Sequence, residues 1–462
     1  MFSFSDLRKG MSRRDFLTVG SAAGLSLPML LNARALGAES GRNIATGKSV
    51  VFLMMHGGPS QFETWNPKDS TNANHRSATG VVQTSVPGLR FGATFPKIAA
   101  RADRLAVIHN YQVENGNHDI KPVVSPHSLN ANLGSLFARV VGPLRANGMP
   151  TNTAIFPNSV DGRGPGPRMN FGNFLSAGPL GASYAPFVPG AGGQMQQNMT
   201  LNVARDRLDD RRSLLAQVDR LRRHIDAAGS VAAVDRFTEQ AFDVILSGIA
   251  SAFDLSREDP RIVAKYDTSR YERPNSWAHK NNRNNYLAHS RTLGKLLLMA
   301  RRMVEAGAGF VTVNTEFVWD MHQDQNNLGV VEGMDLVGTP FDHAVAAFID
   351  DLEARGLADK VLLVATGEIG RTPGLQANGG RNHWGRLTPL FLYGGGITHG
   401  QVIGQSTRDG GEPATDPQRI PNLISTIMHT VFNIGEVRLL PNLPTDVLRV
   451  LTEQRPIPGL VG

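Results

Sequence analysis

Residues Val361–Trp384 read VLLVATGEIGRTPGLQANGGRNHW. The run opens with short apolar and β-branched residues, which is typical of a buried strand. The strand is followed by a carboxylate, Glu368, and then by a glycine-rich loop that carries Arg371, Arg381 and His383. An acid, two arginines and a histidine after one strand favour a site for a metal ion and an anionic substrate.

The chain has the order helix, glycine, strand twice. Leu293–Glu305 has apolar residues at helical spacing, and glycines separate it from the strand-like run Phe310–Asn314. Phe341–Arg355 repeats this order ahead of Val361. The pattern predicts an α/β fold, in which a mainly parallel central sheet is covered by helices on both faces. Its strands are expected at Val50–Met55, Leu105–His109, Phe310–Asn314, Val361–Ala365 and Pro389–Tyr393.

The length of the chain suits either one large domain with insertions or two smaller domains, and no fixed-period repeat is visible. We expect residues 39–462 to form a single domain. A segment rich in Gly, Pro and Asn, at about 142–200, is expected to be an irregular excursion over the core. It either lines the mouth of the active site or is a plain surface loop. Amphipathic helices are expected at Leu201–Ala228, Ala232–Phe253 and Pro417–Phe432.

The N-terminus has the features of an export signal. Ser12–Leu17 reads SRRDFL, an apolar stretch follows to Leu31, and small residues lie at Ala33–Ala38. Residues 1–38 are therefore predicted to be a twin-arginine signal peptide, read by the twin-arginine export machinery. The alternative is an uncut membrane anchor, but the apolar stretch is short against the roughly 20 residues of a membrane span. We expect a periplasmic or cell-surface protein with no stable membrane span after cleavage.

The composition excludes several classes of site and partner. The chain has no cysteine, which rules out disulfides, iron–sulfur clusters and cysteine-ligated zinc. Its net charge is +7 over 462 residues, and no run of Lys and Arg is long enough for a nucleic-acid interface. No nucleic-acid partner is therefore expected, and any metal must be held by His, Asp, Glu or Asn.

Four predicted strands are followed by histidine or a carboxylate. In chain order, the residues that follow these four strands are His56, then His118, then Asp320 with His322, and then Glu368. Ligands in open α/β sheets bind outside the carboxyl ends of the strands. Imidazole and carboxylate together suit Zn²⁺ and related ions. Taken singly, each histidine is more simply a hydrogen-bonded structural residue.

The arginines and hydroxyl groups have two interpretations each. Arg371 either holds an oxyanion or pairs with Glu368 as a structural brace. Ser60, Thr64 and the serines after His118 lie near strand ends, but none is in a Gly-x-Ser-x-Gly turn. A metal-activated water needs no side-chain nucleophile.

The motifs resemble those of a bacterial family known as domain of unknown function 1501, over about Ser49–Asn433. That family is similar to alkaline phosphatases and sulfatases. The resemblance rests on His56-Gly57-Gly58-Pro59-Ser60, Asn117-His118, Trp319-Asp320 with His322, Gly367-Glu368 with Gly370-Arg371-Thr372-Pro373, Gly380-Arg381 with His383-Trp384, and Gly394-Gly395-Gly396-Ile397.

The resemblance implies an alkaline phosphatase/sulfatase-like sandwich with metal ligands on loops at the strand ends. The implied ligands are His56, Asp320, His322, Glu368 and His383. The implied cofactor is a divalent metal ion, with zinc first and manganese or calcium as the other ions considered. Arg371 and Arg381 are expected to stabilise charge on the transferring group, and His118 to act as general acid.

Two functions follow from these expectations. The first is a metal-dependent hydrolase of phosphate or sulfate esters that acts on a small anionic ester or glycan. The second is a non-catalytic, envelope-associated protein that binds anionic glycans in the same place. Glu63 and Asn382 stand where the family often has Asp, and the chain lacks Cys/Ser-x-Pro-x-Arg. Formylglycine-based sulfatase chemistry is therefore not expected.

Overall fold

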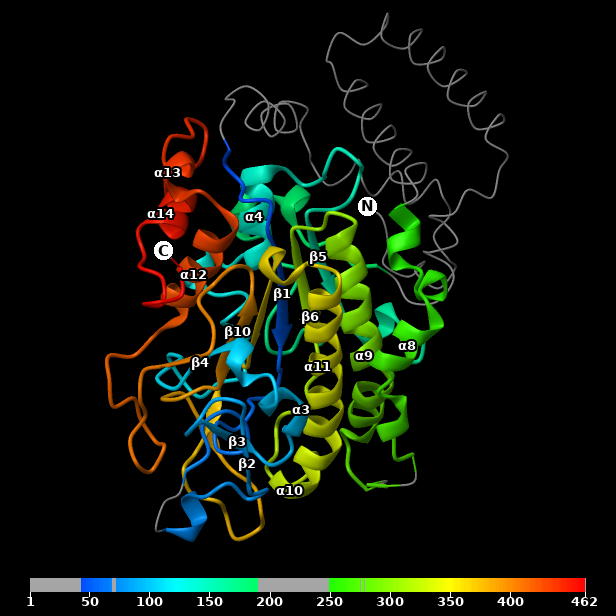
Figure 1. Cartoon of the computed structure of the whole chain (residues 1–462), viewed down its shortest axis with the longest axis vertical. Coiled ribbons are helices and arrows are strands. Elements are labelled where there is room, and N and C mark those ends of the chain that lie inside the picture. Colours follow the sequence, from blue (N-terminus) through cyan, green and yellow to red (C-terminus); the bar gives the residue numbers. More distant parts are fainter. Residues whose placement is uncertain (1–42, 69–71, 190–248, 275, 278, 462) are drawn as a thin grey trace, which may run out of the picture.

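The computed structural model describes residues 43–68, 72–189, 249–274, 276–277 and 279–461 (Figure 1). The predicted signal segment and the helix predicted at 201–228 lie outside these residues, as does most of the helix predicted at 232–253. The described end of the latter is a 3-10 helix at Ile249–Phe253. No helix within the described ranges is both long and apolar enough to cross a membrane.

A seven-stranded sheet forms the centre of the fold, in the order β11-β4-β10-β7-β1-β6-β5. The strands β1 and β7 pair in parallel, and so do β1 with β6 and β6 with β5. Only β10 is antiparallel to its neighbours in this sheet. The bounds are β1 Ser49–Met54, β4 Leu105–Ile108, β5 Asn152–Ile155, β6 Phe310–Asn314, β7 Val361–Thr366, β10 Leu390–Gly394 and β11 Gln401–Ile403.

Helices cover both faces of the sheet (Figure 1). Each face has its own hydrophobic core. Alternate residues of β1 divide between the two: Val51 and Leu53 face one core, and Val50 and Phe52 the other. The first core is covered by α3 Pro96–Ala99, α8 Pro260–Tyr266, α9 Arg283–Glu305, α10 Val330–Gly333 and α11 Thr339–Ala354. The second is covered by α4 Leu133–Val141, α12 Ile420–Val431, α13 Ile434–Val437 and α14 Thr445–Thr452.

The predicted α/β fold class is confirmed, because the described sheet is mostly parallel and lies between two helical layers. All five predicted strands are present within a residue of their expected bounds. Two strands of the sheet, β5 and β11, were not predicted. The helix predicted at Leu293–Glu305 begins ten residues earlier, at Arg283.

The Gly/Pro-rich segment is less irregular than expected at its start. Asn152–Ile155 is an edge strand, β5, and both Asn152 and Thr153 are buried. The described part that follows has 3-10 turns at Pro157–Ser159, Gly178–Leu180 and Ala182–Tyr184. Small two-stranded sheets complete the fold: β2 Val81–Gln83 with β3 Arg90–Gly92, and β8 Gly370–Arg371 with β9 His383–Trp384.

Candidate metal centre

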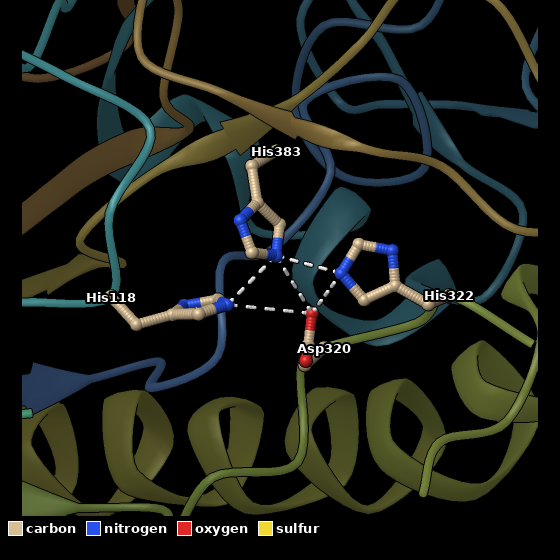
Figure 2. Close-up of side chains that lie close together, drawn as sticks. All are labelled: His118, Asp320, His322 and His383. Carbon is tan, nitrogen blue, oxygen red and sulfur yellow. Dashed lines mark hydrogen bonds and ion pairs between the residues drawn. The ribbon is translucent and has the colours of Figure 1, made fainter. Parts of the chain in front are cut away.

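Four side chains from three parts of the chain meet beyond the sheet: His118, Asp320, His322 and His383 (Figure 2). Each offers one ligand atom, and these atoms all lie within 4.8 Å of one another. His118 comes from the chain after β4, and Asp320 and His322 from the chain after β6. His383 begins β9 in the loop after β7. The fold therefore brings together the residues that follow β4, β7 and β6, each of which is separated from the next by one strand of the sheet.

The carboxylate of Asp320 faces all three imidazole rings. Its Oδ1 lies 2.8 Å from Nε2 of His322 and 3.5 Å from Nε2 of both His118 and His383. The Nε2 atom of His383 lies 2.9 Å from that of His118 and 2.7 Å from that of His322. Three imidazole nitrogens and one carboxylate oxygen thus converge on one point.

This arrangement fits a divalent ion. Tetrahedral zinc with bonds of about 2.0–2.1 Å places its ligand atoms roughly 3.4 Å from one another, and imidazole and carboxylate are among its usual ligands. The separations in the cluster bracket that value. The side chain of His383 is 36% exposed, whereas those of His118 and Asp320 are 8% and 9% exposed. Solvent therefore reaches the cluster mainly at His383.

Glu368 lies behind His118, outside the group of four. Its Oε1 is 2.6 Å from Nδ1 of His118 and 3.0 Å from the backbone nitrogen of Gly57, which donates to it. The carboxylate is fully buried. A proton on Nδ1 of His118 leaves Nε2 with a free lone pair that faces the cluster. This is the usual way in which a carboxylate orients a metal-binding histidine.

Arg371 braces Asp320 rather than Glu368. Its Nη2 donates to Oδ1 of Asp320 at 2.7 Å, and its Nε donates to the carbonyl of Gly58 at 2.7 Å. Nη1 contacts Nε2 of His322 at 3.2 Å and donates to the carbonyl of Arg381. The guanidinium is buried, and its N–H groups donate to protein acceptors at the edge of the cluster.

Arg381 is farther from the cluster in its contacts. Its Nη2 lies 2.9 Å from Oε1 of Glu63, and the guanidinium stacks over Phe62 at 4.5 Å from the ring centre. Its remaining bonds go to the carbonyls of Asn74, Arg76, Thr372 and Pro373. Both arginine and glutamate are fully buried. Arg381 thus holds several surrounding loops together through its hydrogen bonds to their carbonyl groups.

His56 is not part of the group of four. Its ring is fully buried and makes edge contacts with Phe171, Phe174 and Phe317, at 5.0–5.6 Å between ring centres. No described residue reaches either ring nitrogen with ordinary hydrogen-bond geometry. Burial, aided by the charge of His118, lowers the pKa of His56 to about 4. The ring is therefore neutral at neutral pH.

The charges at the cluster favour an ionised aspartate. Burial acts to raise the pKa of Asp320, but the charge of Arg371 and hydrogen bonds from the three histidines hold it well below its usual range. Burial acts to lower the pKa of His118, and its bonds to Asp320 and Glu368 outweigh this and raise it. For His383, burial and the charges of Arg371 and His118 outweigh the bond to Asp320 and lower the pKa.

One supporting residue was not predicted from the sequence. Asn327 donates from Nδ2 to Oδ2 of Asp320 at 3.0 Å, and it also accepts a bond from Asn282. It is the last residue of the polar run HQDQNN at residues 322–327, which is typical of a turn. That run was a signal that the chain doubles back toward Asp320. Asp320 therefore uses one oxygen at the cluster and the other to hold this turn.

Comparison with solved structures finds similar chains at low identity. A sulfatase, PsFucS1, from Pseudoalteromonas sp. is 11% identical, with a TM-score of 0.37; the match covers 93% of this chain and 76% of that one. A phosphonate monoester hydrolase, SpPMH, from Silicibacter pomeroyi is 11% identical, with a TM-score of 0.36 and coverage of 86% and 78%. The lipoteichoic acid synthase LtaP from Listeria monocytogenes is 8% identical, with a TM-score of 0.33 and coverage of 92% and 80%.

No protein with curated annotation matches the sequence. A family model does match, and it covers residues 47–437, which include the whole central sheet and all four residues of the cluster. These residues are most of the chain. The chain therefore belongs to the family described as protein of unknown function (DUF1501).

Proposed function

We propose that the protein is a metal-dependent hydrolase of phosphate or sulfate esters. The observation that carries the proposal is the convergence of His118, Asp320, His322 and His383 within 4.8 Å. We assign these four residues as the ligands of one divalent ion, with zinc the best match to three imidazoles and a carboxylate. Manganese and calcium prefer more oxygen ligands, so they fit this set less well.

When bound, such an ion supplies Lewis acidity, which polarises an ester oxygen and lowers the pKa of water. In the reaction, water adds to phosphorus or sulfur, the bond to the ester oxygen breaks, and that oxygen takes a proton. Arg371 keeps Asp320 ionised and in place through their 2.7 Å bond. Glu368 fixes the ring of His118 from behind. The exposed side of His383 is where the substrate enters.

This assignment gives three residues roles other than those expected from the family resemblance. His118 is proposed as a ligand rather than as the general acid. Glu368 is proposed as the residue that orients His118, and Arg371 as the residue that positions Asp320. His56 is not assigned to the reacting group, because its ring contacts a cage formed by the rings of Phe171, Phe174 and Phe317. Arg381 is not assigned to it either, because its guanidinium bonds to loop carbonyls.

The second candidate is a binding protein for anionic glycans that performs no reaction. The specific observation in its favour is that both guanidinium groups are bonded to protein acceptors. Arginines that are engaged in this way have fewer N–H groups left to stabilise charge in a transition state. In this case, the cluster and its ion hold a sulfate or phosphate group without cleaving its ester.

Metal content and turnover separate the two candidates. The purified protein is analysed for bound metal and assayed with a panel of aryl phosphates, phosphonates and sulfates. A hydrolase contains about one ion per chain and turns over at least one ester, and His383→Ala removes both properties. The matched control is His399→Ala, because His399 is exposed and, among the described residues, bonds only to the carbonyl of Asp103. Turnover that survives His383→Ala rejects the proposed site.

We also propose export by the twin-arginine route, based on Arg13 and Arg14 in SRRDFL. The double substitution of Arg13→Lys and Arg14→Lys keeps the charge of the segment. It is expected to leave the protein in the cytoplasm, because the route reads the arginine pair through a receptor. Cell fractionation measures this. Unchanged export of the double variant contradicts the assignment.

A further inference from the structure

A hollow of about 390 Å³ is lined mainly by residues of α8 and α11. Its apolar wall includes Ile262 and Tyr266 of α8 and Ala346 and Ala347 of α11. The same lining has basic and acidic side chains, namely those of Lys97, Arg101, Lys265, His343, Asp350 and Asp351. The hollow is within the size range of pockets that take small ligands. None of its lining residues belongs to the cluster at Asp320.

Two cations meet on the imidazole of His343; Lys97 and His343 line the hollow, whereas Arg270 is not part of the lining. Nζ of Lys97 lies 2.6 Å from Nδ1 of His343, and Nη2 of Arg270 lies 3.2 Å from the same nitrogen and 2.8 Å from Nε2. A neutral imidazole has one acceptor nitrogen. The short contact from Lys97 uses that nitrogen, so Arg270 faces the ring without an acceptor of its own.

The imidazole is neutral at neutral pH. Burial, followed by the charges of Lys97 and Arg270, lowers the pKa of His343 to about 4. The ring therefore adds no third charge, and it also bonds to the backbone of Lys265. The guanidinium of Arg270 also lies over Tyr271, 5.4 Å from the ring centre, which holds it beside the hollow.

The described residues supply no carboxylate partner within ion-pair distance to either Lys97 or Arg270. The acids nearby are already engaged. Asp350 pairs with Arg101. Asp351 pairs with Arg301 and Arg355. The oxygens of Asp342 accept from the backbone nitrogens of Lys97 and Ile98. The charge of Lys97 also acts on Asp342, and that of Arg270 on Asp267, whose Oδ1 is bonded to Ser269. The half-buried Lys97 and the exposed Arg270 thus converge on one ring, and neither forms a direct ion pair with a described carboxylate.

We propose that this hollow binds the phosphate or sulfate group of a small organic ester, with Lys97 and Arg270 as its charged partners. A tetrahedral oxyanion has enough acceptor oxygens for both cations, and charge-assisted bonds of this kind are the strong ones. It also relieves the repulsion between the cations. The apolar wall of Ile262, Ala346 and Ala347 accommodates the body of the molecule, such as a sugar ring. This site is independent of the proposed hydrolase activity and needs no metal.

Titration calorimetry of the whole protein in the presence of a chelator tests the site. The probes are inorganic phosphate, inorganic sulfate and glucose 6-sulfate. Saturable binding of one molecule per chain is expected, with at least a tenfold loss of affinity in Lys97→Met and in Arg270→Met. Tighter binding of the sugar ester than of the free ions shows that the apolar wall takes part. Equal binding restricts the site to the anion itself.

Two further variants keep the test decisive. Lys97→Arg retains the charge and is expected to retain binding, which separates loss of the cation from loss of the fold. Lys360→Met removes an exposed positive charge elsewhere and is expected to bind as wild type. Equal affinity in Lys97→Met, Arg270→Met and Lys360→Met overturns the proposal. So does binding that His383→Ala abolishes and Lys97→Met leaves intact, because it assigns the anion to the metal centre.

Discussion

Single side chains around the cluster act mainly through what they hold in place. Glu368 and Arg371 are three residues apart, yet they support different members of the group: Glu368 bonds to His118, and Arg371 bonds to Asp320. Asn327 holds the second oxygen of Asp320. Both oxygens of Asp320 are thus fixed by neighbours. The cluster is therefore built before any ion arrives, which reduces the ordering cost of binding.

The substitution Glu368→Gln is expected to weaken zinc binding by roughly 10–100-fold, because the amide no longer fixes the proton on Nδ1 of His118. Competition against a chromophoric chelator measures this affinity. The control is Glu63→Gln, which alters another fully buried carboxylate, one that pairs with Arg381 instead of a cluster residue. If both variants bind zinc as wild type does, Glu368 has no orienting role.

Glu316 is expected to make stability fall with rising pH. It is buried, and Oε1 has no hydrogen-bond partner among the described residues. Burial, opposed by the charge of Arg168, raises its pKa from 4.5 to about 8. The folded state therefore holds a proton that the unfolded state releases between these values, so the unfolding free energy decreases as pH rises from about 4.5 to 8.

The variant Glu316→Gln lacks this titration and is expected to be more stable than wild type at pH 8 by roughly 2–4 kcal/mol. Urea unfolding at pH 5, 6, 7 and 8 gives the two curves. Glu332→Gln serves as the control, since Glu332 is exposed. Wild-type and Glu316→Gln curves that stay parallel over this range contradict the buried, protonated carboxyl.

The sequence correctly predicted which residues follow the strands, but it predicted less well where the side chains of those residues point. Asp320, His322 and His383 come together as the resemblance implied, and His118 joins them. His56 also follows a strand, but its ring turns into the phenylalanine cage. The direction of a side chain beyond a strand depends on the loops that pack on it, and no local pattern encodes that.

At the scale of elements, the turn after β1 is the tightest part of the site. Gly57 has a φ of +112°, and a Cβ there would lie 2.7 Å from the backbone nitrogen of Asp320. The turn also donates the backbone N–H of Gly57 to Glu368. One residue without a side chain thus lets two loops of the metal centre approach each other.

The variant Gly57→Ala is expected to lose more stability than Gly47→Ala. Both residues have positive φ, at +112° and +77°, which costs about 1–2 kcal/mol for a residue with a Cβ. Only Gly57 has atoms within 4 Å of the added carbon, and such overpacking adds roughly 1–3 kcal/mol. Urea unfolding measures both losses. Equal losses contradict the close approach of the two loops.

The elements that the sequence predicted were those with strong apolar patterns. The strands β1, β4, β6, β7 and β10 are continuous apolar runs, which suits strands that are buried on both faces. The missed strands lie at the sheet edges: β5 reads NTAI and β11 reads QVI. Asn152 in β5 is buried because its amide bonds to Ser135 and to the carbonyl of Tyr184. Only the folded chain supplies those partners.

At the scale of the whole molecule, the metal centre joins loops that are far apart in sequence. His118, Asp320 and His383 lie in connections that follow different strands of one sheet. The sheet itself is held by a separate core on each face. The fold therefore does not need the ion for its core, but an ion adds a cross-link between loops at one end of the sheet.

Zinc is expected to raise the melting temperature of the protein by about 5 °C at 1,000-fold excess over its dissociation constant, a linkage of about 4 kcal/mol spread over a large domain. Differential scanning calorimetry with zinc and with a chelator measures the difference. The variant Asp320→Asn is expected to melt at the same temperature in both conditions. A zinc shift that persists in Asp320→Asn places the ion elsewhere.

Because β10 runs antiparallel to β7, a short loop can join the two strands. If β10 were parallel to β7, the chain would have to run back along the full length of β7 before it could pair. Because Leu390 of β10 pairs with Thr366 at the end of β7, the connection from residue 367 to residue 389 leaves and rejoins the sheet at the same edge. The segment that carries Glu368, Arg371 and His383 is thus attached to the sheet at both ends. Insertions or deletions in this connection change its length at little entropic cost and leave the pairing of the strands intact.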